Sequence, residues 1–163
     1  MKKQLSAREA LIRLQDLCAR SEQCTPDLRK KLSGWMITSA DADRIMESLV
    51  KHRFVDDARF ARAYTADKLR FSGWGRYKIM RGLMTKRLGR EIIETALATI
   101  DMEEYTSVAR RVLIVKARAI REGNTYEGRT KLFRFGASRG FETELIARLI
   151  RTEDLWHPHS SED

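Results

Sequence analysis

Apolar residues recur along this chain at the spacing of amphipathic α-helices. The first such stripe, at about 3.6 residues per turn, consists of Ala10, Leu11, Leu14, Leu17 and Cys18. Ser6 and Glu9 have the spacing of a capping box just before that stripe. Convincing alternation of apolar and polar residues, the pattern of a strand, does not occur along the sequence. The pattern therefore predicts an all-α fold.

Residues that begin and end helices divide the rest of the chain. Thr25 is expected to cap a helix in which Pro26 is the first residue. Asp101 and Glu104 have capping-box spacing before a long helix that runs towards Arg121. That helix is expected to end at Gly123, and a later helix at Gly140.

The apolar positions also repeat over a longer distance. Pairs of adjacent apolar residues, separated by two other residues, occur around 45–50, 92–97 and 145–150. Upstream of each set lies a matched pair of positions: Leu28 and Leu32, Ile79 and Leu83, and Leu132 and Gly136. This order predicts three tandem units of three helices each, about nine helices in all. The expected units are 1–55, 56–101 and 102–163, the last including a short polar tail.

Composition adds a strong positive charge to this picture. The chain has 163 residues and a formal net charge of +9, with 34% of its residues charged. Ten Lys and Arg residues and a single acid lie between Arg59 and Arg90, so the remainder of the chain is neutral overall. A charge surplus of this kind indicates either a solvated face or a face that binds an acidic partner, above all nucleic acid.

Other functional classes find little support in the sequence. Apolar runs are too short for a membrane span, and the start of the chain lacks the apolar stretch of a signal peptide. We therefore expect a cytoplasmic protein without membrane association, with Cys18 and Cys24 reduced. Zinc-ligand spacing, a Walker A loop and a nucleophile motif are not found. We expect no catalytic residue, no metal and no cofactor.

The second predicted repeat, 56–101, contains the candidate binding residues. On its first helix, Phe60, Ala61, Tyr64 and Phe71 share one stripe and are expected to face the core. The basic residues on the opposite arc are Arg59, Arg62 and Arg70. The next helix continues the arrangement, because Lys78 and Arg81 lie opposite its buried side.

The turn between these two helices offers further candidates. Arg76 lies beside Gly75 at a helix start, where free backbone N–H groups bind phosphates in many proteins. The alternative is a plain glycine turn. Trp74 lies among basic residues, as stacking residues do in single-strand binders, and the alternative is a buried Trp.

Two segments of the sequence resemble a known family. The run 56–64, Asp-Asp-Ala-Arg-Phe-Ala-Arg-Ala-Tyr, is followed by Gly73-Trp74-Gly75-Arg76-Tyr77-Lys78-Ile79 and Leu83, and 139–141 reads Arg-Gly-Phe. This pattern is similar to the signature of the RecX family, bacterial regulators of the RecA recombinase. The chain departs from the pattern at Arg87, where a Gly is common, and at Gly136, where a Leu is usual.

The resemblance implies an elongated, curved array of three three-helix repeats. It also implies a monomeric, non-enzymatic regulator of DNA repair and recombination that binds the RecA–DNA filament and restrains its ATPase and strand exchange, with single- and double-stranded DNA as further partners. The expected filament or DNA contacts are Arg59, Arg62, Arg70, Trp74, Arg76, Lys78 and Arg81. The alternative function is that of a general DNA-binding protein of the helix-turn-helix kind.

Overall fold

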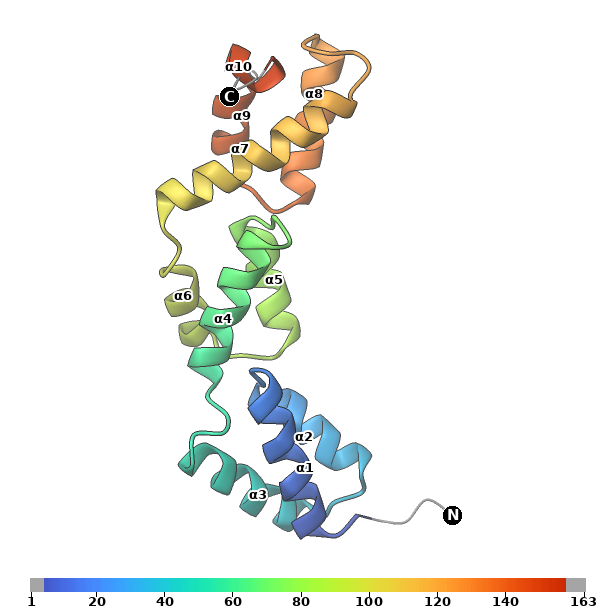
Figure 1. The fold of residues 1–163 in the computed structure, drawn as a ribbon, viewed down its shortest axis with the longest axis vertical. Helices are drawn as coiled ribbons and strands as arrows, with labels where there is room; N and C mark the ends of the chain where they lie inside the picture. Colours follow the sequence, from blue (N-terminus) through green and yellow to red (C-terminus); the bar gives the residue numbers. More distant parts are fainter. Residues whose placement is uncertain (1–4, 158–163) are drawn as a thin grey trace, which may run out of the picture. The chain divides into compact units, whose positions relative to one another are not determined.

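The computed structural model describes residues 5–157, and these residues form α-helices and no strand (Figure 1). The ten helices are α1 (Ala7–Arg20), α2 (Thr25–Gly34), α3 (Ser39–Lys51), α4 (Asp57–Arg70), α5 (Arg76–Thr85), α6 (Arg90–Leu97), α7 (Met102–Ala119), α8 (Tyr126–Ser138), α9 (Thr143–Ile150) and α10 (Glu153–Trp156). The all-α prediction is confirmed. The one helix beyond the expected nine is the short α10.

The chain folds as two compact units. The first contains Met1–Ala63 and Leu83–Ala96, and the second contains Tyr64–Gly82 and Leu97–Asp163. The division falls inside α4 and α5, so each compact unit contains part of the second predicted repeat. The repeat boundaries 1–55, 56–101 and 102–163 stay a prediction, and residues 158–163 of the polar tail lie outside the described residues.

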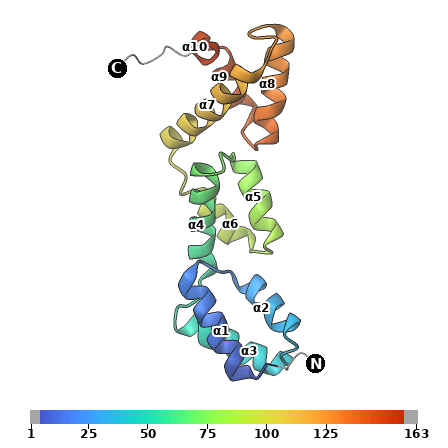
Figure 2. The same cartoon turned by 45° about the vertical axis from the view of Figure 1, so that its right-hand side comes forward.

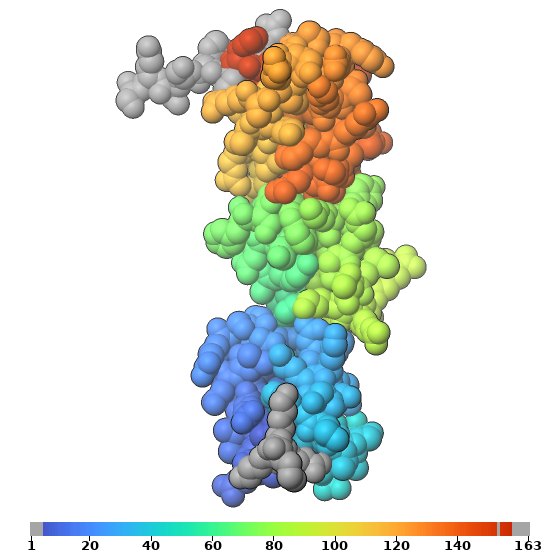
Figure 3. Space-filling model, turned by 90° about the vertical axis from the view of Figure 1, so that its right-hand side faces the viewer, coloured from blue at the N-terminus to red at the C-terminus, as the bar shows by residue number. Residues whose placement is uncertain are grey.

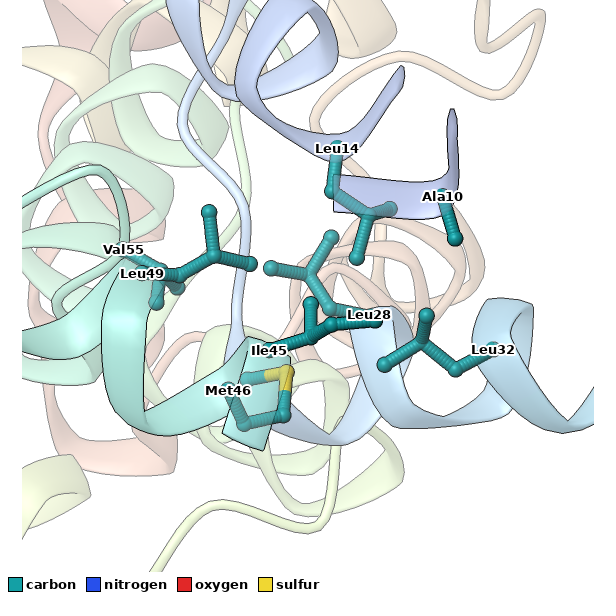
Figure 4. Packing of buried hydrophobic residues seen from close by; sticks show 8 residues of the cluster. All are labelled: Ala10, Leu14, Leu28, Leu32, Ile45, Met46, Leu49 and Val55. Carbon is teal, nitrogen blue, oxygen red and sulfur yellow. The ribbon is translucent and has the colours of Figure 1, made fainter. Parts of the chain in front are cut away.

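The core of the first unit is formed by α1, α2 and α3. Leu14, Leu28 and Leu49, one from each helix, are fully buried and point toward one another (Figure 4). The predicted capping box is present at the start of α1: the backbone N–H of Glu9 donates to Ser6 Oγ, and that of Ser6 donates to the Glu9 carboxylate. The apolar stripes read from the sequence therefore form this core.

The start of α2 differs from the sequence prediction by one residue. The helix begins at Thr25, and its N-cap is Cys24, which makes no side-chain capping bond. The hydroxyl of Thr25 instead donates to Asp57 Oδ2 at 2.6 Å, and the Thr25 backbone N–H donates to Oδ1 at 2.7 Å. The predicted capping hydroxyl thus holds the first residue of α4.

The core of the second unit lies between α7, α8 and α9. Helices α7 and α8 lie side by side in two views, and their side chains adjoin at the surface (Figures 1, 2 and 3). Leu113, Leu132 and Ile146, one from each helix, are fully buried there. The Asp101 carboxylate accepts the backbone N–H of Glu104 at 2.8 Å, so the predicted cap of α7 is confirmed.

The three predicted repeats share a backbone feature as well as an apolar pattern. The turns that follow α2, α5 and α8 each contain one residue with a left-handed backbone: Met36 (φ 60°), Arg87 (φ 58°) and Gly140 (φ 93°). Glycine occupies this conformation without strain, whereas other residues pay a cost. Arg87 thus occupies a position that favours Gly, as its departure from the family pattern predicts.

At the second departure from the family pattern, Gly136, a neighbouring side chain fills the space that a larger residue would take. Gly136 is buried in α8, and a Cβ added there would lie 3.0 Å from Cδ1 and Cγ1 of Ile146. The fully buried Ile146 side chain therefore occupies the space beside the missing side chain. The third repeat is packed at this point in spite of the glycine.

Candidate nucleic-acid interface

The basic span between Arg59 and Arg90 is partly neutralised by acids that lie outside it. Five of its ten cations form ion pairs: Arg59 with Glu22, Arg70 with Glu104, Arg76 with Glu142, Lys86 with Asp27, and Arg90 with Glu94. Each acid lies outside the span. In the folded protein these acids offset part of the positive charge of the span, so its surplus is smaller than the sequence count indicates.

Two of the candidate residues, Arg59 and Arg62, belong to the first compact unit, although both lie in the second predicted repeat. The Arg59 guanidinium donates to Glu22 at 2.6 Å and to the backbone carbonyls of Arg53 and Phe54. These bonds fasten the start of α4 to the chain that precedes it. Arg62 is exposed on the same helix.

The end of α4 holds Arg70 and an exposed aromatic ring. Arg70 Nε donates to Glu104 at 2.5 Å, and this bond raises the pKa of Arg70 and lowers that of Glu104. The prediction that Phe71 faces the core is wrong, because its side chain is 84% exposed. Helix α4 ends at Arg70, so the helical stripe does not extend to Phe71.

The backbone N–H groups at the start of α5 are hydrogen-bonded to other parts of the protein. The backbone N–H groups of Gly75 and Tyr77 donate to the carbonyls of Arg139 (2.7 Å) and Gly140 (3.0 Å). The backbone N–H of Arg76 donates to the hydroxyl of Tyr105 at 2.9 Å. These donors are not available to a phosphate, which argues against the phosphate site that the sequence suggested.

The side chain of Arg76 takes part in the same contact. Its guanidinium donates to Glu142 at 3.2 Å and lies over the ring of Tyr105. The Tyr105 hydroxyl donates to the other Glu142 oxygen at 2.5 Å, and burial is the main cause that raises the pKa of this hydroxyl. Arg139 completes the contact by donating to the carbonyl of Ser72.

Sequence reasoning missed this contact between the α4–α5 turn and the α8–α9 turn. Its members, Tyr105, Glu142 and Arg139, are far from Arg76 in the chain and form no motif by spacing. The signal that was present is the pair Gly75 and Gly140, since a Cβ on Gly75 would meet the backbone of Gly140 and Phe141, and a Cβ on Gly140 would meet Lys78 at the start of α5. Both glycines belong to the signature segments, so the signature describes a packing contact.

The remaining candidates gather around Trp74. The ammonium groups of Lys68 and Lys78 lie 4.6 and 4.7 Å from the centre of the Trp74 ring, and Lys68 also lies 5.4 Å from that of Tyr64. We call these four residues the Trp74 cluster. Trp74 is half-buried, so neither a fully buried Trp nor a free ring describes it. Arg81 is exposed one helical turn beyond Lys78 on α5.

Such a cluster has the chemistry of a nucleic-acid contact. Lysine ammonium groups bind phosphates as point charges, and aromatic rings stack on bases. Two cations against one ring also repel each other, so an anion beside them relieves this repulsion. Phe71 and Tyr77, which is 52% exposed, add aromatic surface in the same segment.

Other chemistry has little support within the part of the chain that the structure describes. No group of three or more His, Cys, Asp or Glu side chains there is arranged to hold a metal ion. The two cysteines are free, and burial raises the pKa of the Cys24 thiol to about 11. No helix among the described residues is long and apolar enough to cross a membrane.

Comparison with known proteins supports the sequence resemblance. Residues 56–97 match the family model described as RecX, second three-helix domain. The Regulatory protein RecX of Clostridium beijerinckii is 28% identical over 149 residues, which are 90% of this chain and 68% of the relative. That of Vibrio parahaemolyticus is 26% identical over 150 residues, 92% of this chain and 93% of the relative.

Two solved structures share the fold. The crystal structure of RecX from Lactobacillus salivarius has a TM-score of 0.80 at 18% identity and covers 91% of this chain and 97% of that one. Another crystal structure of regulatory protein RecX has a TM-score of 0.79 at 20% identity, with 88% and 70% covered.

The fold and the site define an all-α protein of three-helix units with a basic and aromatic surface. Within that class, residues 56–97 match the second three-helix domain of RecX, and the chain is similar over about nine tenths of its length to curated RecX regulatory proteins. These findings support a protein of the RecX family.

Proposed function

We propose that this protein is a non-enzymatic regulator that binds the RecA–DNA nucleoprotein filament and restrains its ATPase and strand exchange. It would thereby modulate recombination and DNA repair. The Trp74 cluster is the observation that supports this proposal beyond the similarity to RecX proteins, because its two lysines and its indole ring together can contact both phosphates and bases. The partners are the RecA filament and the DNA within it.

Within the proposed interface the candidate residues have different roles. Arg62, Arg70, Lys78 and Arg81 are exposed or near the surface of α4 and α5, and with Lys68 and Trp74 they would contact the filament. Arg59 and Arg76 are held by Glu22 and Glu142, and they would act by fixing the helices that carry the others.

Restraint of the filament requires no catalytic group on this chain. A bound protein changes the ATPase of its partner when it has a higher affinity for one filament state than for another. Cations that contact phosphates also accelerate association at low ionic strength. The proposed regulator therefore acts through binding energy alone.

The test is DNA-dependent ATP hydrolysis by preformed RecA filaments. The wild-type protein is expected to lower hydrolysis at less than one molecule per recombinase subunit. The double variant Lys68→Glu, Lys78→Glu is expected to lose this effect, and Lys68→Arg, Lys78→Arg to retain it. Arg134→Glu, Arg148→Glu, which makes the same charge change at exposed positions on α8 and α9, is the matched control.

Two results would contradict the proposal. In the first, hydrolysis and strand exchange are unchanged by a folded wild-type protein that binds free DNA well, which favours the general DNA-binding alternative. In the second, the control variant loses as much activity as the Lys68, Lys78 variant, which removes the Trp74 cluster from the interface.

A further inference from the structure

The first and second units contain equivalent turn contacts that differ in how closely they approach. In the second unit the turn after α8 packs on the start of α5, where Gly75 faces Gly140. In the first unit the turn after α5 lies beside α2. The positions that correspond to the two glycines are Cys24, which precedes α2, and Arg87, which has the left-handed backbone after α5.

Without the two glycines, the first-unit contact is open. A hollow of about 740 Å³ lies between α2 and the turn after α5. Its lining comprises Thr25, Pro26, Asp27, Arg29, Lys30, Ser33, Thr85, Lys86 and Arg87. We call this hollow the Arg87 groove. Backbone contact closes the equivalent position in the second unit, whereas side chains line it here.

The lining of the Arg87 groove is strongly cationic. Four of its residues are Lys or Arg and one is an acid, Asp27, which is paired with Lys86 at 2.6 Å. Arg29 is paired with Asp43. Lys30 and Arg87 are exposed and form no ion pair with any described residue. Three hydroxyls, those of Thr25, Ser33 and Thr85, lie on the same lining.

We propose that the Arg87 groove is a second nucleic-acid contact, which binds the phosphodiester backbone of DNA. It lies in a different compact unit from the Trp74 cluster. Pockets for small apolar ligands are lined mainly by hydrophobic and aromatic side chains, which this groove lacks. Cations together with hydroxyls are the side chains that contact DNA phosphates. The proposal deepens the proposed function by adding to its DNA contacts, and it rests on DNA being a partner.

The backbone conformation of Arg87 allows its effect on stability to be separated from its effect on binding. A left-handed backbone is costly for Arg, and Gly140 shows that glycine fits the equivalent turn. Met36 has the same left-handed backbone after α2, so the conformation alone assigns no role to Arg87; its role follows from its position on the groove lining. The strained backbone does provide a substitution, Arg87→Gly, for which stability and DNA binding are expected to change in opposite directions.

The test is DNA binding measured by fluorescence anisotropy without any recombinase, so that it is independent of filament regulation. The variant Lys30→Glu, Arg87→Glu is compared with the wild type on single-stranded and on duplex oligonucleotides. If both cations meet phosphates, affinity falls by roughly tenfold or more at low salt. The log–log salt slope becomes shallower by about 1.4 on single strands, or about 1.8 on duplex. The control is Arg8→Glu, Arg44→Glu, which changes the charge equally at exposed positions on α1 and α3.

The single variant Arg87→Gly separates binding from folding. It relieves the left-handed backbone, so its melting temperature is expected to equal or exceed that of the wild type, while its DNA affinity falls. Loss of affinity on either DNA, absent in the control, supports the groove. Equal affinity and equal salt slope for the wild type and both groove variants on both DNAs would overturn it. Filament regulation could still hold in that case through the Trp74 cluster.

Discussion

Gly75 and Gly140 lie in direct backbone contact, although they are 65 positions apart in the sequence. A Cβ on Gly75 would lie well inside 3.0 Å of the Gly140 carbonyl and the Phe141 nitrogen. A Cβ on Gly140 would meet the backbone of Lys78 equally closely. The two turns that carry the family signature are therefore joined at a point where only glycine fits.

Replacing Gly75 by alanine is expected to destabilise the second unit. The added methyl group meets backbone atoms, which cannot rotate away, and overpacking of this kind costs about 1–3 kcal/mol. The melting temperature measured by circular dichroism should fall accordingly. Gly34→Ala is the control, because nothing lies within 4 Å of a Cβ at that position. Equal melting temperatures for Gly75→Ala and wild type would show that the contact is looser than described.

The pair Gly136 and Ile146 allows a test of the compensation in the third repeat. Gly136→Leu is expected to destabilise the fold by about 1–3 kcal/mol through overpacking, and Ile146→Ala by about 2–5 kcal/mol through a cavity. The double variant should lose less than the sum, since the new leucine fills the space that Ile146 leaves. Strict additivity in urea unfolding would mean that the two positions do not share that space.

Asp56 is expected to give the start of α4 a pH-dependent stability. Its carboxylate accepts the backbone N–H of Arg59 at 3.0 Å, and this bond is the main cause that lowers the pKa of Asp56. A lowered pKa means that the stabilisation is complete above the ordinary Asp value of about 3.9 and is lost as the pH falls through the lower, folded-state value. Asp56→Ala should cost about 1 kcal/mol at pH 7.

Melting temperatures between pH 7 and pH 2.5 measure this effect. Asp56→Asn keeps a capping oxygen but does not titrate, so its melting temperature should fall less steeply in acid than that of the wild type. Asp16→Asn, on the exposed side of α1, is the matched control. Parallel curves for the wild type and Asp56→Asn would contradict the role assigned to Asp56.

The two cysteines are expected to differ in reactivity. Cys24 is fully buried, and burial raises its pKa to about 11, so the thiol stays protonated at pH 8. Cys18 is half-buried, and its pKa is also raised, mainly by burial. Iodoacetamide should modify Cys18 first, as followed by mass spectrometry, and both in urea. Equal labelling of both cysteines in the folded protein would contradict this environment for Cys24.

The helices and their buried faces followed from local sequence. Leu14, Leu28 and Leu49 each lie in an apolar stripe with the period of an α-helix. The capping residues of α1 and α7 directly precede the apolar stripes of those helices. Such signals act over one or two helical turns, so a single sequence contains them in full. Phe71 was misplaced because the end of α4 is set by the turn that follows.

The candidate site was less predictable because its contacts are not local. The sequence placed three arginines on one basic face: Arg59, Arg70 and Arg76. Each forms an ion pair with a glutamate that lies 34 to 66 residues away in the chain, namely Glu22, Glu104 and Glu142. Composition counts the cations of a segment but not the acids that fold against it. The two lysines beside Trp74 likewise meet only because α4 and α5 are brought together by the turn.

A comparison of filament and free DNA separates a recombinase regulator from a general DNA-binding protein. The affinity of the wild-type chain is measured for RecA filaments on single-stranded DNA and for the same DNA alone, at one ionic strength. The proposed function predicts tighter binding to the filament, and this preference should shrink in Lys68→Glu, Lys78→Glu. Equal or weaker binding to the filament than to the bare DNA would contradict it.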